Sequence, residues 1–416
     1  MEEDSGGRHV KTLPSAGTDE QPAGRRAGDV RPTPGPEEPD GPSAPETGGA
    51  HAAAPELEQT GRVRVRRQRR RGPWRRMKRF VRRHKALSII FLVALLLLAI
   101  LIGWLWWLNH KLGDIDRFPL DVGGNRPARV GNAENFLLIG VDDPEGQGGL
   151  FDDLTSGHWT PGKFRSDAIM VLHISGDRKS AQLVSIPRDS FVDVPDAGRT
   201  KINAAFSYGG PSELTQVVES LSDIRIDHAV VIDFQHLADM TTALGGIDVI
   251  QPEDVTDPRN GYTWQKGPLH LEGEKAVWYV RQRYGMPRGD FDRIQRQQNV
   301  LRAMLDKTAS AGTLANPFRV TKLVTELSSF VAVDTGFTPS QMRSLAISSR
   351  GIRPANMRFV TVPVTGTPTI DGASVVTLDL TKTAELFDAL ENDRFEDWFE
   401  KHSADIDQLP PPGQVR

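Results

Sequence analysis

Two acidic residues of the sequence lie at the ends of short apolar runs that we expect to form strands. Asp142 follows the run 136–141, and Asp167 opens the run 168–174. If these strands pair antiparallel, the end of one lies beside the start of the other, and the two carboxylates share one site. Carboxylate oxygens are the ligands that a hard cation such as Mg²⁺ prefers. Turn and cap positions are the other common use of Asp at strand ends, so the spacing leaves both interpretations open.

Arginine is the second residue type that could do chemistry. Arg188, in the motif SIPRD, lies just past an expected strand end. Ligands of α/β sheets gather at the carboxyl ends of strands, and a guanidinium can bind phosphate through two hydrogen bonds. A surface ion pair with Asp189 is the alternative interpretation of this motif.

The densest polar cluster of the sequence lies in and before an expected long helix at 291–307. We expect Arg281 and Arg283 in the last turn of the preceding helix, where cations also complement the helix dipole. Arg293 and Gln297 lie one turn apart, at the edge of an apolar stripe, and polar groups in such a place need partners. The acidic residues nearby look like cap and first-turn residues. An anionic ligand such as a phosphate is therefore a natural partner for these side chains.

Composition excludes several classes of function. The chain has 416 residues and no cysteine, so disulfides, thiolate metal sites and cysteine nucleophiles are excluded. Its net charge of −3 averages a strongly basic run before residue 86 with an acidic remainder, which argues against nucleic acid as the partner of the folded part. The sequence has no G-x-S-x-G elbow, P-loop or dinucleotide fingerprint.

The first 108 residues predict a membrane anchor. Residues 1–61 are rich in Pro, Gly, Ala and Glu, which predicts a disordered cytoplasmic tail, and 62–85 form a basic juxtamembrane segment. Residues 86–108 carry no charge and are long enough to cross a hydrocarbon core of roughly 30 Å as a helix, with three Trp at the far end. A cleaved signal peptide would be shorter, and a buried core helix is rarely so uniformly apolar.

The charge bias predicts the orientation of this single-pass protein in the cell membrane. Basic residues stay on the cytoplasmic side, so the amino terminus is expected in the cytoplasm and residues 109–416 outside. We interpret the basic run as a topology signal that also contacts anionic lipid. Binding of nucleic acid is its less favoured interpretation.

Beyond the anchor, strand-like and helix-like segments alternate. We expect a linker at 109–133, one domain at 134–395 and a tail at 396–416. Apolar strands between helices predict an α/β fold: a three-layer α/β/α domain with a mixed central sheet. The expected strands are 136–141, 168–174, 183–187, 228–232, 247–250 and 357–363. The expected helices are 211–222, 234–244, 272–284, 291–307, 320–330, 339–349 and 381–390.

Seven ordered motifs give the chain a resemblance to a known family. They read LLIGVDD, FRSDAIM, VSIPRDSFVDVP, TKINAAFSYGG, ALGGIDV, LEGEKAVWYVRQR and GDFDRIQRQQNVL, between about residues 135 and 307, with a weaker continuation to about 363. In this order they resemble the LytR–CpsA–Psr family of cell-wall ligases.

The resemblance implies a Mg²⁺-dependent phosphotransferase that moves a glycopolymer from an undecaprenyl-pyrophosphate carrier onto peptidoglycan through a phosphodiester. Asp142 and Asp167 would then hold the metal, and Asp142 is a candidate base. An apolar tunnel between sheet and helices would take the polyprenyl chain. The implied pyrophosphate-binding residues are Arg165, Arg188, Lys201, Arg281, Arg283, Arg293 and Gln297, with Asn203 in the same motif as Lys201. The implied catalytic residues are Asp142, Asp167, Arg188, Arg281 and Arg283.

The sequence departs from the family pattern at one point and leaves other functions open. The acidic motif reads Val141-Asp142-Asp143-Pro144, so either Asp142 or Asp143 is the metal ligand. A lipid-pyrophosphate hydrolase would use the same residues, with water in place of the glycan hydroxyl. A non-catalytic receptor for lipid-linked glycans would use the arginines alone. A DNA-binding regulator acting through the basic run is disfavoured by the apolar helix that follows it.

Overall fold

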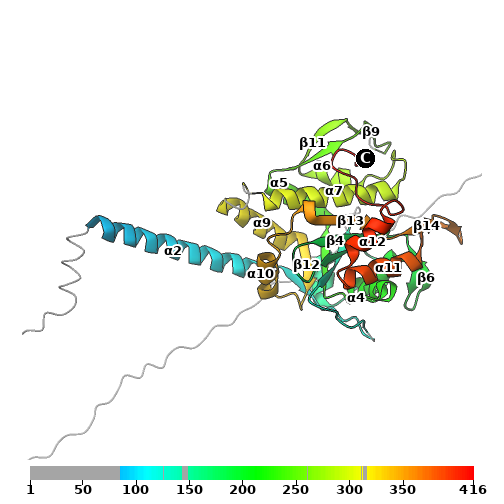
Figure 1. Cartoon of the computed structure of the whole chain (residues 1–416), viewed down its shortest axis with the longest axis horizontal. Helices are drawn as coiled ribbons and strands as arrows, with labels where there is room; N and C mark the ends of the chain where they lie inside the picture. The colour runs from blue at the N-terminus through cyan, green and yellow to red at the C-terminus, as the bar shows by residue number, and fades with distance from the viewer. Residues whose placement is uncertain (1–84, 125, 143–148, 260, 311, 313–315) are drawn as a thin grey trace, which may run out of the picture. The chain divides into compact units, whose positions relative to one another are not determined.

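The computed structural model describes residues 85–124, 126–142, 149–259, 261–310, 312 and 316–416 (Figure 1). All of these residues fall within one compact unit, Trp74–Arg416. The expected cytoplasmic tail (1–61) and the basic segment (62–85, apart from Lys85) lie outside the described residues.

The apolar segment predicted at 86–108 forms helix α2, Lys85–Lys111. A helix of these 27 residues is about 40 Å long, enough to cross a hydrocarbon core of roughly 30 Å. Its most apolar window is not buried against the rest of the chain. By length and composition, α2 is therefore a candidate membrane span.

A seven-stranded mixed sheet forms the centre of the domain, in the order β1-β12-β7-β2-β3-β4-β13. β2 runs parallel to β7 and antiparallel to β3, which confirms the pairing predicted for the strands that carry the two acidic residues. The bounds of the strands are β1 Asp116–Phe118, β2 Glu134–Val141, β3 Ser166–Ile174, β4 Ala181–Ile186, β7 His228–Asp233, β12 Val331–Asp334 and β13 Met357–Thr361.

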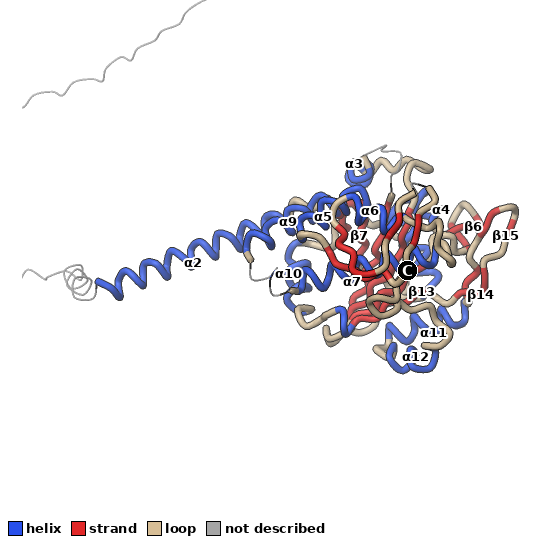
Figure 2. Tube along the Cα trace, turned by 90° about the horizontal axis from the view of Figure 1, so that it is seen from above, coloured by secondary structure: helices blue, strands red, loops and turns tan. Residues whose placement is uncertain are grey.

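Helices cover both faces of this sheet (Figure 2). Successive side chains of a strand point to opposite faces, so Leu137 and Ile139 of β2 join one core and Leu138 joins the other. The first core is closed by α4 Asn203–Ser222, α11 Leu380–Glu391 and α12 Phe395–His402. The second core is closed by α5 Leu237–Leu244, α6 Glu274–Arg281, α7 Asp290–Ala309 and α9 Pro317–Phe330. The predicted three-layer α/β/α fold is confirmed.

Shorter elements complete the domain. In the part of the chain that the structure describes, five two-stranded sheets pair β5 with β6, β8 with β11, β9 with β10, β14 with β17 and β15 with β16. Their bounds are β5 Phe191–Val194, β6 Gly198–Lys201, β8 Ile247–Gln251, β9 Val255–Thr256, β10 Thr263–Trp264, β11 Gly267–Leu271, β14 Val364–Gly366, β15 Thr369–Ile370, β16 Ala373–Ser374 and β17 Thr377–Leu378. The remaining helices are α3 Leu150–Ser156, η1 Phe234–His236, α10 Pro339–Ser348 and η2 Pro354–Asn356.

The packed domain extends past both boundaries expected at 134 and 395. β1 lies inside the expected linker 109–133, where Phe118 is buried and the strand pairs with β12. The expected tail 396–416 begins inside α12, which buries Phe395, Trp398 and Phe399 in the first core. Their i, i+3, i+4 spacing makes one apolar face, a pattern that the Pro and charge content of this region obscures. Residues 403–416, the C-terminal strap, then run back to a buried Val415.

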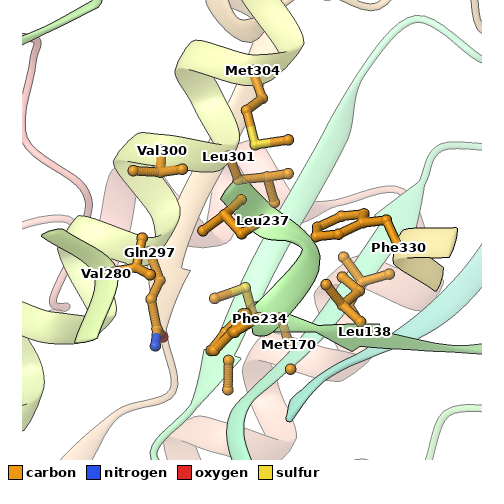
Figure 3. A pocket seen from close by; sticks show the side chains of 13 residues that line it. Leu138, Met170, Phe234, Leu237, Val280, Gln297, Val300, Leu301, Met304 and Phe330 are labelled. Atoms are coloured by element: carbon orange, nitrogen blue, oxygen red, sulfur yellow. The ribbon is translucent and has the colours of Figure 1, made fainter. Parts of the chain in front are cut away.

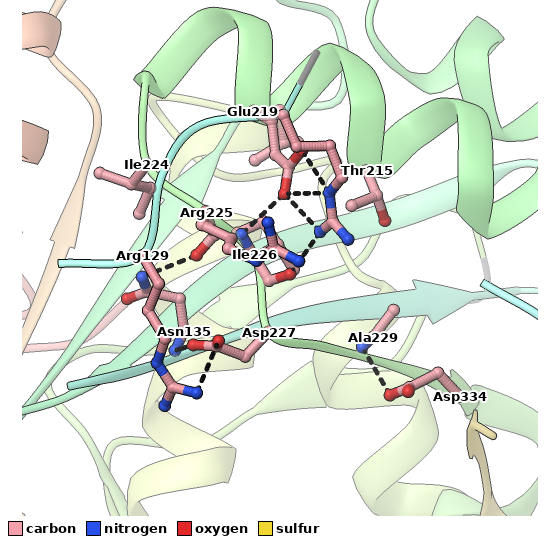
Figure 4. A network of polar contacts seen from close by, with 12 residues as sticks. Arg129, Asn135, Thr215, Glu219, Ile224, Arg225, Ile226, Asp227, Ala229 and Asp334 are labelled. Carbon is pink, nitrogen blue, oxygen red and sulfur yellow. Dashed lines mark hydrogen bonds and ion pairs between the residues drawn. The ribbon is translucent and has the colours of Figure 1, made fainter. Parts of the chain in front are cut away.

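A polar network lies at the end of the sheet where β2 and β7 begin (Figure 4). Glu219 of α4 accepts hydrogen bonds from the Arg126 guanidinium (2.6 Å) and from the backbone N–H of Ile226 (2.8 Å). Asp227 accepts from the backbone N–H of Asn135 (2.9 Å). Because buried carboxylates need such partners, the network fixes the end of α4 against the starts of two central strands.

The same end of the sheet buries a neutral histidine. His173 of β3 lies opposite Asn135 of β2, and its Nδ1 donates to Asn135 Oδ1 (2.7 Å), because the Asn135 amide nitrogen donates to the Arg225 carbonyl (2.8 Å). Burial lowers the pKa of His173 to about 4. The folded chain therefore holds this ring uncharged at neutral pH.

We predict that His173 weakens the fold in acid. The unfolded chain binds a proton near pH 6.5 and the folded chain only near 4, so stability falls as pH drops through that window, by about 3 kcal/mol in total. Denaturant unfolding in detergent at pH 7 and pH 4.5 measures this loss. The variant His173→Gln should lose less stability on acidification than the native chain, whereas His158→Gln, at an exposed position, should lose the same amount as the native chain. Equal acid losses in His173→Gln and the native chain would contradict the assignment.

Candidate active site

The two predicted carboxylates meet at the end of the sheet opposite the polar network. Asp142 directly follows β2, and Asp167 lies near the start of β3. The ladder pairs Gly140 with Ala168 and Val141 with Ser166, so Asp167 is an extra residue without a partner, a β-bulge. A bulge re-aims the side chain of the inserted residue. Asp167 lies close enough to Asp142 for their charges to interact. Asp143, the alternative ligand, lies outside the described residues.

Each carboxylate is paired with a predicted arginine. Arg281, the last residue of α6, donates to Asp142, and Arg188, after β4, donates to Asp167. Helix α6 ends at Arg281 because the backbone of Gln282 is extended. Arg283 therefore lies beyond the helix and not in its last turn, where the sequence predicts it.

A third carboxylate joins the cluster from the first turn of α7. Arg293 Nη2 lies 2.7 Å from Asp290 Oδ1 and 3.5 Å from the backbone oxygen of Asp167. Arg188 Nε lies 3.8 Å from the same Asp290 oxygen. Asp290 is a first-turn residue and not the cap of this helix, since the N-cap position is Gly289. The i, i+3 spacing of Asp290 and Arg293 was the signal in the sequence for this pair.

Burial shifts the protonation of the cluster. Desolvation raises the pKa of Asp142, the Arg281 guanidinium opposes this rise, and the charge of Asp167 adds to it. Desolvation lowers the pKa of Arg293. It also opposes the charged form of Arg188, but Asp167 and Asp290 outweigh that effect and raise the pKa of Arg188. The site therefore holds charges that depend on one another for their stability.

The guanidiniums retain unused hydrogen-bonding capacity. Nε of Arg188, of Arg281 and of Arg293 is buried without a hydrogen-bond partner. Orphaned buried donors are uncommon in folded proteins and point to a ligand. Among the described residues, the three guanidiniums paired with carboxylates are joined by those of Arg283, whose charge acts on Arg293, and of Arg165, which lines the adjoining pocket with Arg188 and Arg283.

A polar pocket of about 1010 Å³ adjoins this cluster. Arg165, Arg188 and Arg283 line it together with Lys201 and Asn203. Lys201 Nζ pairs with Asp189 Oδ1 at 2.9 Å. Lys201 therefore contributes to the pocket wall but brings its own counter-charge, and Asp189 pairs with it and not with Arg188 as the surface alternative supposed.

An apolar pocket of about 560 Å³ lies between the sheet and the helices of the second core (Figure 3). Its lining is apolar except for Gln297, one turn after Arg293 on α7. Both polar atoms of the buried Gln297 amide lack a hydrogen-bond partner. Figure 3 shows Gln297 and Phe330 on opposite sides of the pocket. α7 therefore presents Arg293 to the charged cluster and Gln297 to the apolar pocket.

The C-terminal strap, part of the segment 396–416 that the sequence predicts as a tail, holds α7 in place. Gln295 Nε2 donates to Asp407 Oδ1 (2.9 Å), and Arg302 donates to the carbonyl of Pro410 (2.9 Å). The fully buried Arg296 donates to the backbone oxygen of Arg416 (2.7 Å) and stacks over the Tyr279 ring, 4.3 Å from its centroid. These contacts fix the helix that carries Arg293 and Gln297.

The chemistry of the carboxylates fits a magnesium ion. Among the described residues, no set of three or more side chains from His, Asp, Glu or Cys is placed to hold an ion. Mg²⁺ commonly uses one or two carboxylates and takes its other ligands from substrate phosphates and water. The neighbouring carboxylates of Asp142 and Asp167 fit that requirement, with Arg188 and Arg281 beside them.

Known proteins are similar to this chain in sequence and in fold. A sequence profile of the LytR_cpsA_psr family matches residues 116–392. The probable cell wall biosynthesis protein LcpB of Corynebacterium glutamicum is 34% identical over 287 residues, 68% of this chain and 66% of that protein. The polyisoprenyl-teichoic acid–peptidoglycan teichoic acid transferase TagV of Bacillus subtilis is 34% identical over 219 residues, 48% of this chain and 55% of that protein. The chain thus spans less than two thirds of the length of each of these relatives.

A solved structure agrees with these sequence matches. The crystal structure of Bacillus subtilis TagV superposes with a TM-score of 0.51 at 27% identity, over 64% of this chain and 98% of that one. The profile match covers well over half of the chain, which confirms the resemblance drawn from the seven motifs. The chain belongs to the LytR_cpsA_psr family.

Proposed function

We propose that this chain is a Mg²⁺-dependent phosphotransferase of the cell membrane, a glycopolymer–peptidoglycan ligase. It takes a glycopolymer from an undecaprenyl-pyrophosphate carrier and joins it to peptidoglycan through a phosphodiester. The amino terminus lies in the cytoplasm and the domain outside, as the arginine run before α2 favours.

One observation carries the proposal: a charged cluster and an apolar pocket share helix α7. Arg293 faces the carboxylates and guanidiniums, and Gln297 lines the apolar pocket one turn later. A lipid-linked pyrophosphate has the matching chemistry, with a dianionic head beside a long hydrocarbon chain. Neither a soluble sugar phosphate nor a fatty acid alone would use both halves of the site.

The names of relatives support the acceptor and the donor. TagV of Bacillus subtilis is named as a transferase of teichoic acid from a polyisoprenyl carrier to peptidoglycan. LcpB of Corynebacterium glutamicum is named as a probable cell wall biosynthesis protein. The shared family and fold make the same class of reaction the natural proposal here.

The residues have distinct roles in this reaction. The guanidiniums of Arg188, Arg281 and Arg293 bind the pyrophosphate oxygens through the donors that now lack partners, and those of Arg165 and Arg283, with Lys201, extend this binding into the polar pocket. They stabilise the charge that develops on the phosphoryl group. A glycan hydroxyl forms a new bond to the phosphorus attached to the sugar, and the bond to the bridging oxygen breaks, so undecaprenyl phosphate leaves.

The proton of the attacking hydroxyl needs an acceptor. Burial raises the pKa of Asp142, which suits a general base better than an ordinary Asp. Asp142 and Asp167 together would hold Mg²⁺, which when bound supplies charge neutralisation at the phosphates. Gln297 lies where the pyrophosphate meets the lipid and donates to the adjoining oxygen.

We predict that Arg281→Ala lowers ligation about 10²–10³-fold, because it removes a donor to developing charge and leaves Asp142 without its partner. Mass spectrometry of the full chain with a polyprenyl-pyrophosphate glycan and a peptidoglycan oligomer measures the phosphodiester conjugate. Arg358→Ala, which breaks an exposed ion pair with Glu396, is the matched control and should retain activity. Polyprenyl phosphate released without conjugate would identify a hydrolase instead, and tight binding without either product would identify a receptor.

Metal removal gives a second prediction. Chelator should abolish conjugate formation and added Mg²⁺ should restore it, because without the metal the carboxylates of Asp142 and Asp167 place negative charge beside the phosphates. In Asp167→Asn the Mg²⁺ concentration for half-maximal activity should rise, since the amide keeps the shape of the side chain but loses its charge. Full activity of the native chain in excess chelator would refute metal dependence.

Filling the apolar pocket gives a third prediction. Met304→Trp replaces an unbranched side chain of the pocket wall with a bulky indole ring. Activity with a full-length polyprenyl carrier should therefore fall more than activity with a short-chain carrier. Asp306→Trp adds the same ring to an exposed position of α7 and should leave both activities unchanged. Equal losses with the two carriers would show that the lipid chain binds elsewhere.

A further inference from the structure

The amino-terminal half of α9 runs alongside the apolar helix α2. Trp104 Nε1 donates to Thr321 Oγ1 (3.0 Å), and Arg343 of α10 donates to Asn109. Leu112, after the end of α2, and Phe330, at the end of α9, both pack into the second core. Trp104 contacts Thr321, while Leu112 and Phe330 belong to the same core, so moving back along α9 from Phe330 to Thr321 means moving back along α2 from Leu112 to Trp104.

This geometry sets the level of α9 relative to α2. Trp104 lies seven residues before Lys111, which corresponds to about 10 Å along the helix axis. Phe318 lies three residues before Thr321, which carries it about 5 Å further in the same direction. Phe318 is therefore level with the last apolar turns of α2, where a membrane-spanning helix reaches the lipid–water boundary.

The residues at this level have the composition of a lipid contact. The Phe318 side chain is 83% exposed, the most exposed large apolar side chain of the described residues. Arg319 and Lys322 lie on the same face of α9, are exposed and form no ion pair within the described part of the chain. An aromatic ring with adjacent unpaired cations suits the interface of a bilayer, where the ring enters the acyl boundary and the cations meet phosphates.

We propose that the first two turns of α9 dock into the bilayer surface, with Phe318 in the acyl boundary and Arg319 and Lys322 on phospholipid phosphates. The proposal rests on α2 crossing the membrane, as proposed above. Its occupant is lipid because the face is continuous with α2 through the Trp104–Thr321 contact and because its charge complements anionic headgroups.

Docking through α9 would connect the bilayer to the apolar pocket. Phe330, at the other end of the same helix, lines that pocket on the side opposite Gln297 (Figure 3). A helix fixed in the lipid surface at Phe318 therefore holds the pocket at a constant height above the membrane. A lipid carrier would then meet the charged cluster without leaving the bilayer completely.

Spin labels on the full chain in vesicles test the docking. The chain has no cysteine, so a single introduced cysteine is labelled cleanly. We would label Phe318→Cys, Leu97→Cys within α2 and Leu380→Cys on the exposed surface of α11, and compare collisions with oxygen, which enriches in lipid, and with a water-soluble nickel chelate. The docking predicts that the label at 318 prefers oxygen, as at 97, whereas the label at 380 prefers the chelate.

Each other pattern overturns the proposal in a recognisable way. A label at 318 that prefers the chelate, with 97 in lipid, places α9 in water and leaves the membrane anchor intact. Exclusion of both reagents from 318 identifies a protein partner on this face. A label at 97 that prefers the chelate would show that α2 does not cross the membrane. None of these readings depends on transferase activity, so loss of the proposed function is a separate result.

A second comparison tests the headgroup contacts. The label at 318 should lie deeper in vesicles of phosphatidylcholine with phosphatidylglycerol than in phosphatidylcholine alone. This difference should vanish in Arg319→Gln/Lys322→Gln, which keeps both side chains polar and long. Equal depth in both vesicle types for the otherwise native chain would overturn the role of the two cations.

Discussion

The pairing of half-buried charges at the end of β2 and the start of β3 constrains the rest of this structure. Asp142, Asp167 and Asp290 sit in a place where an isolated charge would be costly. Asp142 and Asp167 are each paired with an arginine from another element, and Asp290 pairs with Arg293 of its own helix and lies near Arg188. Four elements, β2, β3, α6 and α7, and the segment after β4 must therefore be in register at once. The same arrangement leaves the Nε donors of Arg188, Arg281 and Arg293 without hydrogen-bond partners, and these are the donors that the proposed anion would use.

Much of the fold follows from local patterns. The apolar runs before Asp142 and after Asp167 predict two neighbouring strands, and their antiparallel pairing places both residues at one edge, as observed. Long-range packing accounts for what the sequence did not predict. The bulge at Asp167 is a property of two strands together, and β1 is too short to show a period. Phe395, Trp398 and Phe399 were hidden because Pro and charged residues follow them, although their spacing predicts a helix face.

Helix α7 joins the two halves of the site, and contacts with other parts of the chain stabilise it. Its first turns are polar and buried, a combination that requires partners from elsewhere in the chain. The C-terminal strap supplies them to Gln295, Arg296 and Arg302. Residues beyond 392, where the family profile ends, thus help to set the position of Arg293 and Gln297. One rigid helix therefore connects the part of the site proposed to bind the pyrophosphate head with the part proposed to bind the lipid chain.

The bulge has a consequence for how such a site arises and is lost. Gly140–Ala168 and Val141–Ser166 are the pairs on either side, so the hydrogen-bond ladder would close into a regular one if Asp167 were deleted. The carboxylate sits on a residue that the sheet does not require. A relative shortened by one residue here could fold into the same sheet and yet lack half of the acidic pair. Strand length at this single point, rather than overall similarity, would separate family members that keep the site from those that keep only the scaffold.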